Sequence, residues 1–373
     1  MTPRERVLAA MNGEEVFPMA SDVFENGVHP ELRAKLLRHF GLAADDNEGL
    51  LKALDACIRW ARPLYIGPPL EELPSFTPVY PALKVVKDMW GACGECTATY
   101  HDGTHCPLRA VQTVAEVDAY PWPTPDWFDY DRVGWILDPP ASHLPAAEWA
   151  KRNGDYARLA GGWSAVFSRA MDLFGMEVGL VNIAENPAVM EATIAHIGDF
   201  WEEFYRRFAR ACRGHFDILA WGDDFASQQG LLIKPATWRK WFLPIWKRLF
   251  AIAHENDMKS ALHTCGSVRA VIGDLIDVGL DILEIVQVTA VGMDPKELKR
   301  EFGQHLTFYG GMDTQHILPH GSTEDVRREV RRLCDILGEN GRYVFTTMHF
   351  LMDDVPMENV LAMYDEVKAY RRG

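Results

Sequence analysis

The pair His263 and Cys265, separated by one residue, is the most informative chemical pattern in the sequence. In an extended segment, side chains two residues apart point to the same side, so an imidazole nitrogen and a thiolate sulfur can bind one ion. With Zn–N bonds of about 2.0–2.1 Å and Zn–S bonds of about 2.3 Å, the pair supplies half of a zinc site. The alternative is a histidine bonded to backbone at a strand end, followed by a buried, inert cysteine.

Three acids are further candidates for chemistry. Asp223 and Asp224 are adjacent, and they can bind a metal, position a substrate hydroxyl or act as a general base, or else serve as charges at the start of a helix. Glu284 lies in an apolar run, where a carboxylate needs a partner to remain ionised. It is expected either to face a barrel interior as a metal or proton-transfer group, or to form a salt bridge with a neighbouring strand.

A second cysteine-rich segment contains Cys93 and Cys96 in CxxC spacing, followed by His101, His105 and Cys106. This spacing allows a structural zinc site, but a second CxxC or CxxH is missing, so a plain hairpin or loop is the other interpretation. The sequence has no GxGxxG motif between a strand and a helix, no GxxxxGK[ST] and no GxSxG. Dinucleotide-binding, P-loop and serine-hydrolase classes therefore lack their defining residues.

The elements that position these residues follow a regular rhythm from residue 156 onward, where short apolar runs alternate with amphipathic segments. Strands are expected over 156–162, 216–221, 259–263, 281–285, 306–310 and 343–347. Helices are expected over about 188–212, 235–256, 267–277, 295–303, 323–339 and 357–371. Successive strand–helix units imply parallel strands with right-handed crossovers.

The first 155 residues are less regular. Helices are expected at about 3–12 and 30–40, and residues 120–140 are too rich in proline and turn residues for regular structure. If this part supplies the remaining strands, the sequence predicts an α/β fold, a (β/α)8 TIM barrel with irregular N-terminal insertions. We expect residues 1–373 to form one such domain.

Barrel enzymes place their chemistry in the loops that follow the strands, and the polar residues of this chain fall there. The residues at the ends of five of the expected strands, or directly after them, are Asp223 and Asp224; His263 and Cys265; Glu284 and Gln287; Gly310, Gly311 and Asp313; and Met348 and His349. We expect a substrate to contact Gln287, Gly311 and Asp313. Aromatic side chains are expected to roof the barrel mouth and exclude water, with Trp90, Trp163 and Phe225 as the preferred candidates.

Composition narrows the classes of partner. With 38 Lys and Arg against 53 Asp and Glu, the net charge is −15, which repels phosphate backbones and argues against nucleic acid as a partner. No run approaches 18 apolar residues and the chain does not start with a basic, apolar signal peptide, so we expect a cytoplasmic protein without a membrane partner. Seven cysteines without a regular framework are typical of a reducing compartment.

Several segments of the C-terminal half together resemble a known superfamily. LHTCGSVRAVIGDLIDVGLDILEIVQ, LTFYGGMDTQHILPHG and DVPMENVLAMYDEV are similar to the uroporphyrinogen decarboxylase superfamily, and especially to its corrinoid-linked methyltransferase-like branch. The resemblance covers residues 155–373 well and is weaker before that. It implies a (β/α)8 barrel, in agreement with the rhythm of strands and helices.

The resemblance also implies a metal site. In the methyltransferase branch, a His-x-Cys pair and a residue at the end of the last barrel strand, commonly cysteine, hold zinc. The pair matches His263 and Cys265, and the third position falls on His349, with Glu284 or Asp224 as an additional ligand or neighbouring group. An imidazole in place of a thiolate removes one negative charge, which makes a stronger Lewis acid and argues against coenzyme-M-type substrates.

The resulting hypothesis is a zinc-dependent methyltransferase. It would move a methyl group between a small methylated substrate, such as an ether, amine or thiol, and a corrinoid. No DxHxxG corrinoid-binding segment is present, so the corrinoid (cobalamin) would belong to a carrier protein. A homodimer is compatible with such a barrel.

Two alternatives remain. One is a metal-independent, decarboxylase-like lyase in which Asp223 or Asp224 protonates a carbanion, and the other is a non-catalytic ligand-binding barrel. The resemblance places an arginine-rich cradle for propionates near the first strand of a decarboxylase, whereas this chain has SDVFENGVHPE there. A tetra-acid substrate would meet unfavourable charges at that position.

Overall fold

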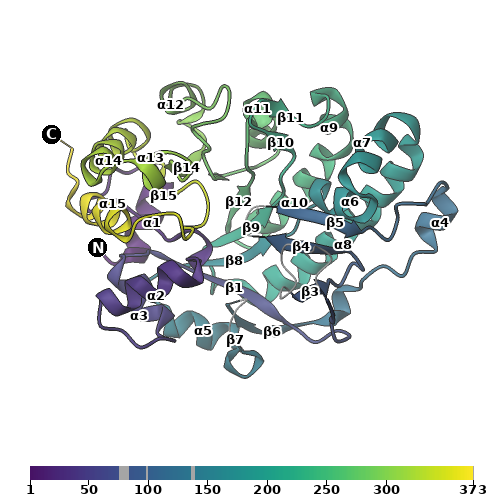
Figure 1. Ribbon diagram of the computed structural model, residues 1–373, viewed down its shortest axis with the longest axis horizontal. Helices are drawn as coiled ribbons and strands as arrows, with labels where there is room; N and C mark the ends of the chain where they lie inside the picture. The colour runs from purple at the N-terminus through teal and green to yellow at the C-terminus, as the bar shows by residue number, and fades with distance from the viewer. Residues whose placement is uncertain (75–83, 98–99, 136–138, 373) are drawn as a thin grey trace.

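Parallel strands form the centre of the molecule, and helices surround them (Figure 1). The computed structural model describes residues 1–74, 84–97, 100–135 and 139–372. In order across the sheet, the parallel strands are β1 (Ile58–Tyr65), β8 (Ala157–Trp163), β9 (Ile218–Gly222), β12 (Lys259–His263), β13 (Ile282–Glu284), β14 (Thr307–Met312) and β15 (Tyr343–Thr347).

Helices follow these strands in the sequence. They include α8 (Pro187–Cys212), α10 (Leu243–Glu255), α11 (Arg269–Asp277), α12 (Pro295–Phe302), α14 (Thr323–Leu337) and α15 (Met357–Ala369). Each strand predicted from residue 156 onward is present within two residues of its expected ends. The helix expected over 235–256 is divided into α9 (Pro235–Trp241) and α10, because Pro244 in the first turn of α10 starts a new helix.

The gap between the two ends of the parallel sheet is filled by a short segment near the N-terminus. Ser21 forms a parallel bridge with Phe345 of β15, the Asp22 N–H donates to the Phe345 carbonyl at 2.9 Å, and the Cys57 N–H donates to the Ser21 carbonyl at 2.8 Å. This segment is too short to be a strand, because the chain turns into a 3-10 helix, η1 (Phe24–Asn26), directly after it. The expected α/β fold with a large parallel sheet is confirmed, but strand pairing does not close an eight-stranded barrel.

The two faces of the sheet bury different sets of side chains. One cluster, which includes Ile58, Leu159, Ala220, Ala261 and Tyr309, takes alternate residues from neighbouring strands and is enclosed by the sheet. A larger cluster takes the intervening strand residues and packs them against the helices. Strand residues on the same face as the first cluster, at the carboxyl ends, are those that can reach the central site.

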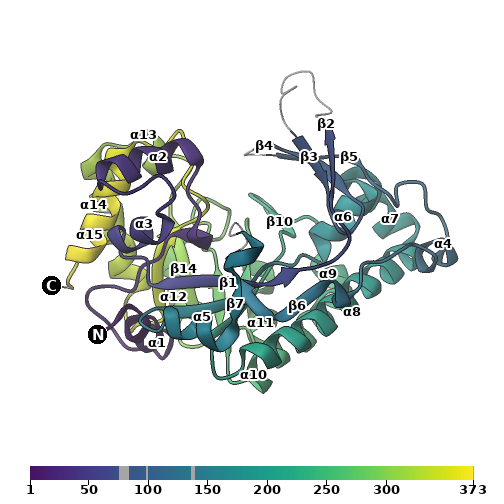
Figure 2. The same cartoon turned by 90° about the horizontal axis from the view of Figure 1, so that it is seen from below.

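The first 155 residues contain the expected helices and several hairpins. The helices are α1 (Pro3–Met11), α2 (Pro30–His39), α3 (Asn47–Ala53), α4 (Val114–Asp118) and α5 (Ala146–Arg152). The strands β2 (Glu71–Pro74), β3 (Lys84–Lys87), β4 (Cys93–Thr97) and β5 (Tyr100–His105) form hairpins that project on one side of the molecule near α6 (Phe167–Phe174) and α7 (Met176–Glu185), as Figure 2 shows. The remaining strands and helix are β7 (Leu144–Pro145), β10 (Ala226–Ser227), β11 (Gly230–Leu231) and α13 (Ile317–His320).

The expectation of irregular structure over 120–140 was wrong for its middle part. Residues Phe128–Gly134 form β6, which pairs antiparallel with the second half of β1. The pairing partners include Arg62 with Gly134 and Tyr65 with Phe128. The edge of β1 beyond its contact with β8 offers unpaired backbone groups, and satisfying them outweighs the local turn signals.

Candidate metal centre

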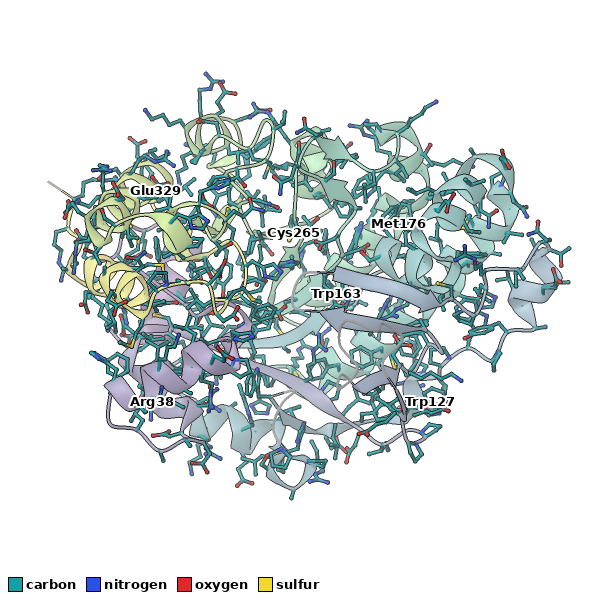
Figure 3. The ribbon with its side chains drawn as sticks, in the orientation of Figure 1. Arg38, Trp127, Trp163, Met176, Cys265 and Glu329 are labelled. Atoms are coloured by element: carbon teal, nitrogen blue, oxygen red, sulfur yellow. The ribbon has the colours of Figure 1, made fainter. Side chains whose placement is uncertain are left out.

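Three side chains capable of binding a metal meet at the carboxyl ends of β9 and β12. One ligand atom each from Asp224, His263 and Cys265 lies within 4.8 Å of the others. Cys265 Sγ is 3.6 Å from His263 Nε2, which is 3.8 Å from Asp224 Oδ1. Figure 3 shows Cys265 and Trp163 in the central part of the molecule. A carboxylate, an imidazole and a thiol are a donor set that fits Zn²⁺.

Neighbouring hydrogen bonds fix the chain that carries the triad. The Cys265 N–H donates to Asp224 Oδ1 at 2.6 Å, and the Gly266 N–H donates to Gln287 Oε1 at 2.6 Å. Ser168 Oγ donates to the Asp224 carbonyl and accepts from the Asp224 N–H. The backbone amides of Cys265 and Gly266, in the loop after β12 (the cysteine loop), are thus each held by a side chain that follows another strand. These bonds keep the Cys265 thiol beside the His263 imidazole.

Electrostatics leave the triad short of positive charge. Burial raises the pKa of the Cys265 thiol well above its usual value, and the carboxylates of Asp224, Glu25 and Glu284 raise it further. His263 Nδ1 is buried and has no hydrogen-bond partner among the described residues. A bound cation would offset the negative field and favour the thiolate, so this arrangement is suited to holding a metal ion.

His349 lies near the triad but is not part of the group of three. The Phe24 ring contacts both imidazoles, with centroids 5.3 Å from His263 and 5.8 Å from His349. Desolvation and the neighbouring His263 lower the pKa of His349, although the residue is exposed as a whole. The role of His349 as third ligand therefore stays a prediction, and Asp224 is the residue that the geometry brings to the pair.

Glu284 occupies the next strand end, in parallel register with His263. It is 1% exposed, and its Oε1 has no partner among the described residues. Burial raises its pKa well above the usual value, and Glu25 and Asp22 raise it further. Among the described residues, Glu284 therefore faces the interior and forms no salt bridge. Of the two expectations for this acid, a metal or proton-transfer role is the one that remains.

Sequence reasoning missed two acids in the segment that fills the gap in the sheet. Asp22 is fully buried and accepts hydrogen bonds from Tyr309 Oη at 2.5 Å and from the Ile58 N–H at 3.2 Å. Burial raises the pKa of Asp22 to about 7. Glu25 is half-buried beside it. The available signal was the acid-rich segment SDVFENG, in which two acids stand where an arginine cradle would be expected.

The predicted substrate-binding residues separate into two groups. The Trp163 ring lies edge-on to the His263 imidazole at 6.0 Å. Gln287 holds the cysteine loop, as described above, and Asp313 Oδ1 accepts from the backbone of the turn at 315–316. These residues lie at the strand ends, and a role in substrate contact remains a prediction for each of them.

The other three predicted residues make core contacts. Trp90 is 1% exposed and packs edge-on against Phe200 of α8, whereas Phe225 packs against Trp238. Gly311 has a φ of 104°, a conformation that favours glycine, and a Cβ added there would meet Leu333 of α14 at 3.5 Å, an ordinary packing distance. The side chains of Cys93, Cys96, His101 and His105 lie outside the described residues.

Substitutions at Asp224 and His349 distinguish the two candidates for third ligand. We expect Asp224→Asn to weaken zinc binding by about 10–100-fold, because the amide keeps an acceptor for the Cys265 N–H but loses the charge. His349→Ala is expected to change the affinity by less than about threefold. Zinc titration against a chromophoric chelator measures both. A larger loss in His349→Ala than in Asp224→Asn would make His349 the ligand.

The buried carboxyl group of Asp22 predicts a pH dependence of stability. Its pKa in the folded protein, about 7, is above the usual value of 3.8 for this side chain, so the folded state binds more protons between these values. The free energy of unfolding therefore falls as the pH rises through this window. We expect Asp22→Asn to reduce the fall between pH 5 and pH 8 by about 2 kcal/mol. Urea unfolding of this variant and of the exposed control Asp45→Asn, which should match wild type, tests the prediction.

The fold places the chain among α/β proteins with a central parallel sheet and a site at the strand ends. It is similar to a methyltransferase from Methanosarcina mazei, with a TM-score of 0.61, 16% sequence identity and coverage of 99% of both chains. A family model described as uroporphyrinogen decarboxylase (URO-D) matches residues 111–370, so the chain belongs to this family. No curated protein sequence matches the chain. Among the helices of the described ranges, none has the length and apolar character needed to cross a membrane.

Proposed function

We propose that the protein is a zinc-dependent methyltransferase. The reaction would transfer a methyl group between the heteroatom of a small methylated substrate and a corrinoid carried by a partner protein. The observation that carries this proposal is the meeting of Asp224, His263 and Cys265 within 4.8 Å at the strand ends. Membership of the URO-D family and similarity in fold to a methyltransferase support it.

The residues of the triad would hold the metal, with His349 as the other candidate ligand. When bound, zinc acts as a Lewis acid on the substrate heteroatom, which makes a thiol a better nucleophile or an ether oxygen a better leaving group. Asp224 has a second role, since it also holds the Cys265 N–H. Trp163 covers one edge of the His263 imidazole and helps to exclude water from the site.

A decarboxylase-like lyase is less well supported by the positions of the acids. Asp223 accepts hydrogen bonds from the Phe167 and Ser168 N–H groups at the start of α6, at 2.8 and 2.9 Å, so its carboxylate is occupied. Near the centre of the sheet, SDVFENG contributes Asp22 and Glu25 instead of arginines. These charges repel a polycarboxylate substrate.

Metal analysis and a methyl-transfer assay test the proposed function together. Purified protein is expected to contain one zinc per chain and to demethylate methylcobalamin in the presence of 2-mercaptoethanol, which forms the methyl thioether and cob(I)alamin. The absorbance of the corrinoid follows the reaction. A metal-free wild type that decarboxylates uroporphyrinogen, and transfers no methyl group to or from any corrinoid, would replace this proposal with the lyase.

A further inference from the structure

Glu25 is an acid next to the metal centre whose position is fixed by the backbone. It has a left-handed conformation, with φ of 45°, and so does Asn26, with φ of 54°. The Asn26 side chain ties this turn to β1, since Nδ2 donates to the Ile58 carbonyl at 3.2 Å and Oδ1 accepts from the Trp60 N–H at 3.3 Å. Uncommon backbone angles of this kind persist where the surrounding structure holds them, and they concentrate at functional sites.

The Glu25 carboxylate is half-buried and has no ion pair or hydrogen bond with any other described residue. Its charge nevertheless acts on the centre. After burial, Glu25 is the largest cause of the raised pKa of Glu284, and together with Asp224 it raises the pKa of Cys265. A partly desolvated carboxylate without a counter-charge is unfavourable, so this position is suited to a positive group.

Two buried polar atoms beside the triad have no hydrogen-bond partner among the described residues. They are Glu284 Oε1 and Thr264 Oγ1. Glu284 is the register partner of His263, and the Thr264 N–H donates to the Glu284 carbonyl at 2.6 Å. Buried polar groups are normally hydrogen-bonded, so these atoms point to an additional bound group.

Aromatic residues contact the turn that carries Glu25. The Phe24 ring packs edge-on with Phe350 at 5.0 Å and also contacts both imidazoles. Trp135 Nε1 donates to the Glu25 carbonyl at 3.4 Å. Gly27 leaves room for Phe350, because an added Cβ would lie 2.5 Å from its Cε1 atom. Aromatic faces attract ammonium groups through cation–π interaction, and a nearby carboxylate attracts them by charge.

The competing feature is Arg62 at the carboxyl end of β1. Its Nε donates to the Gly161 carbonyl at 3.0 Å, and its Nη2 donates to the Trp163 carbonyl at 3.3 Å. The guanidinium thus binds the backbone of β8 and does not pair with Glu25. An anionic substrate would have to use the remaining donors of Arg62, against the field of the neighbouring acids.

We propose that the small substrate of this site is cationic. Its ammonium group would bind beside Glu25 and the rings of Phe24 and Phe350, while its heteroatom reaches the metal held by the triad. This inference rests on the proposed function and specifies its substrate class. It makes Glu25 a specificity-determining residue, because the Glu25 carboxylate distinguishes a positive from a neutral or negative substrate tail.

Three small thiols that differ in charge test the proposal on zinc-loaded protein. Calorimetric titration is expected to show cysteamine binding about tenfold more tightly than 2-mercaptoethanol, with 2-mercaptoethanesulfonate weakest; a tenfold ratio corresponds to about 1.4 kcal/mol. Glu25→Gln should reduce the preference for cysteamine over 2-mercaptoethanol to about threefold or less. Glu14→Gln, which makes the same charge change at an exposed position, should behave as wild type.

A zinc-independent comparison separates this inference from the proposed function. Choline and its neutral isostere 3,3-dimethyl-1-butanol are titrated into metal-free protein, with tryptophan fluorescence as the readout. Wild type is expected to bind choline more tightly than 3,3-dimethyl-1-butanol, whereas Glu25→Gln is expected to bind the two compounds equally. A charge preference without zinc binding would contradict the methyltransferase and support the cation site. Zinc and thiol binding without a charge preference, or a preference for the sulfonate that Glu25→Gln does not change, would overturn the cation site.

Discussion

Replacement of Cys265 by alanine is expected to abolish stoichiometric zinc binding and leave the fold intact. The thiol supplies the softest donor of the triad, and no described cysteine other than Cys265 belongs to it. Losing an outer hydrogen-bond partner of a metal site costs about 10–100-fold in affinity, so loss of a ligand should cost at least about 100-fold. The remaining Asp224 and His263 form too small a donor set for a zinc site.

Zinc content after dialysis against a weak chelator measures this effect, with thermal unfolding to check the fold. Cys106→Ala is the matched control, because Cys106 is also a half-buried cysteine but does not belong to the triad. The control should retain one zinc per chain. Retention of full zinc content by Cys265→Ala would place the metal elsewhere and remove the basis of the proposed function.

The parallel sheet could be predicted because its signals are local. Each parallel strand from β8 onward is a short apolar run followed by an amphipathic helix, and β12 (Lys259–His263) was predicted with its observed ends. The eighth position of the sheet could not be predicted in this way. Residues 20–22 depend on backbone bonds to Phe345 and Cys57, which are far away in the sequence, and so they carry no strand pattern of their own.

The metal pair could be predicted for the same reason, since its spacing is contained in three residues. Asp224 was a candidate because it follows an expected strand, and Glu284 because it is an acid in an apolar run; the structure places both beside His263. Glu25 was not a candidate, because its position depends on a left-handed turn held by Asn26. Left-handed angles at a Glu have no recognisable pattern in a single sequence.

The aromatic residues that line the site were harder to predict, because an aromatic residue at a site and one in the core look the same in the sequence. Trp163 contacts the His263 imidazole, whereas Trp90 belongs to a cluster with Phe200 and Trp201. Both residues lie in irregular or glycine-rich segments of the sequence. The environment of Trp163 at the site and that of Trp90 in the core become distinct only once α8 has packed in the folded protein.

Asp223 provides the second large effect, and its role differs from that of the adjacent Asp224. Its carboxylate is fully buried and accepts from the Phe167 and Ser168 N–H groups, and also from the Val166 N–H, at the start of α6. Because Val166, the residue before α6, provides no side-chain cap, Asp223 satisfies amides that would otherwise be orphaned. Ser168 then links α6 to Asp224.

Asp223→Ala is therefore expected to lower the free energy of unfolding by about 3 kcal/mol. Each buried N–H left without a partner costs about 1–3 kcal/mol. Part of this cost is offset, because the variant no longer buries a carboxylate. Burial of that carboxylate is unfavourable, since it raises the pKa of Asp223 to about 7. Asp223→Asn keeps an acceptor and should lose only about 1 kcal/mol. Urea unfolding of both variants gives the values. If Asp223→Ala instead keeps the stability of wild type but loses activity, Asp223 acts on the substrate, and the lyase would regain its proton donor.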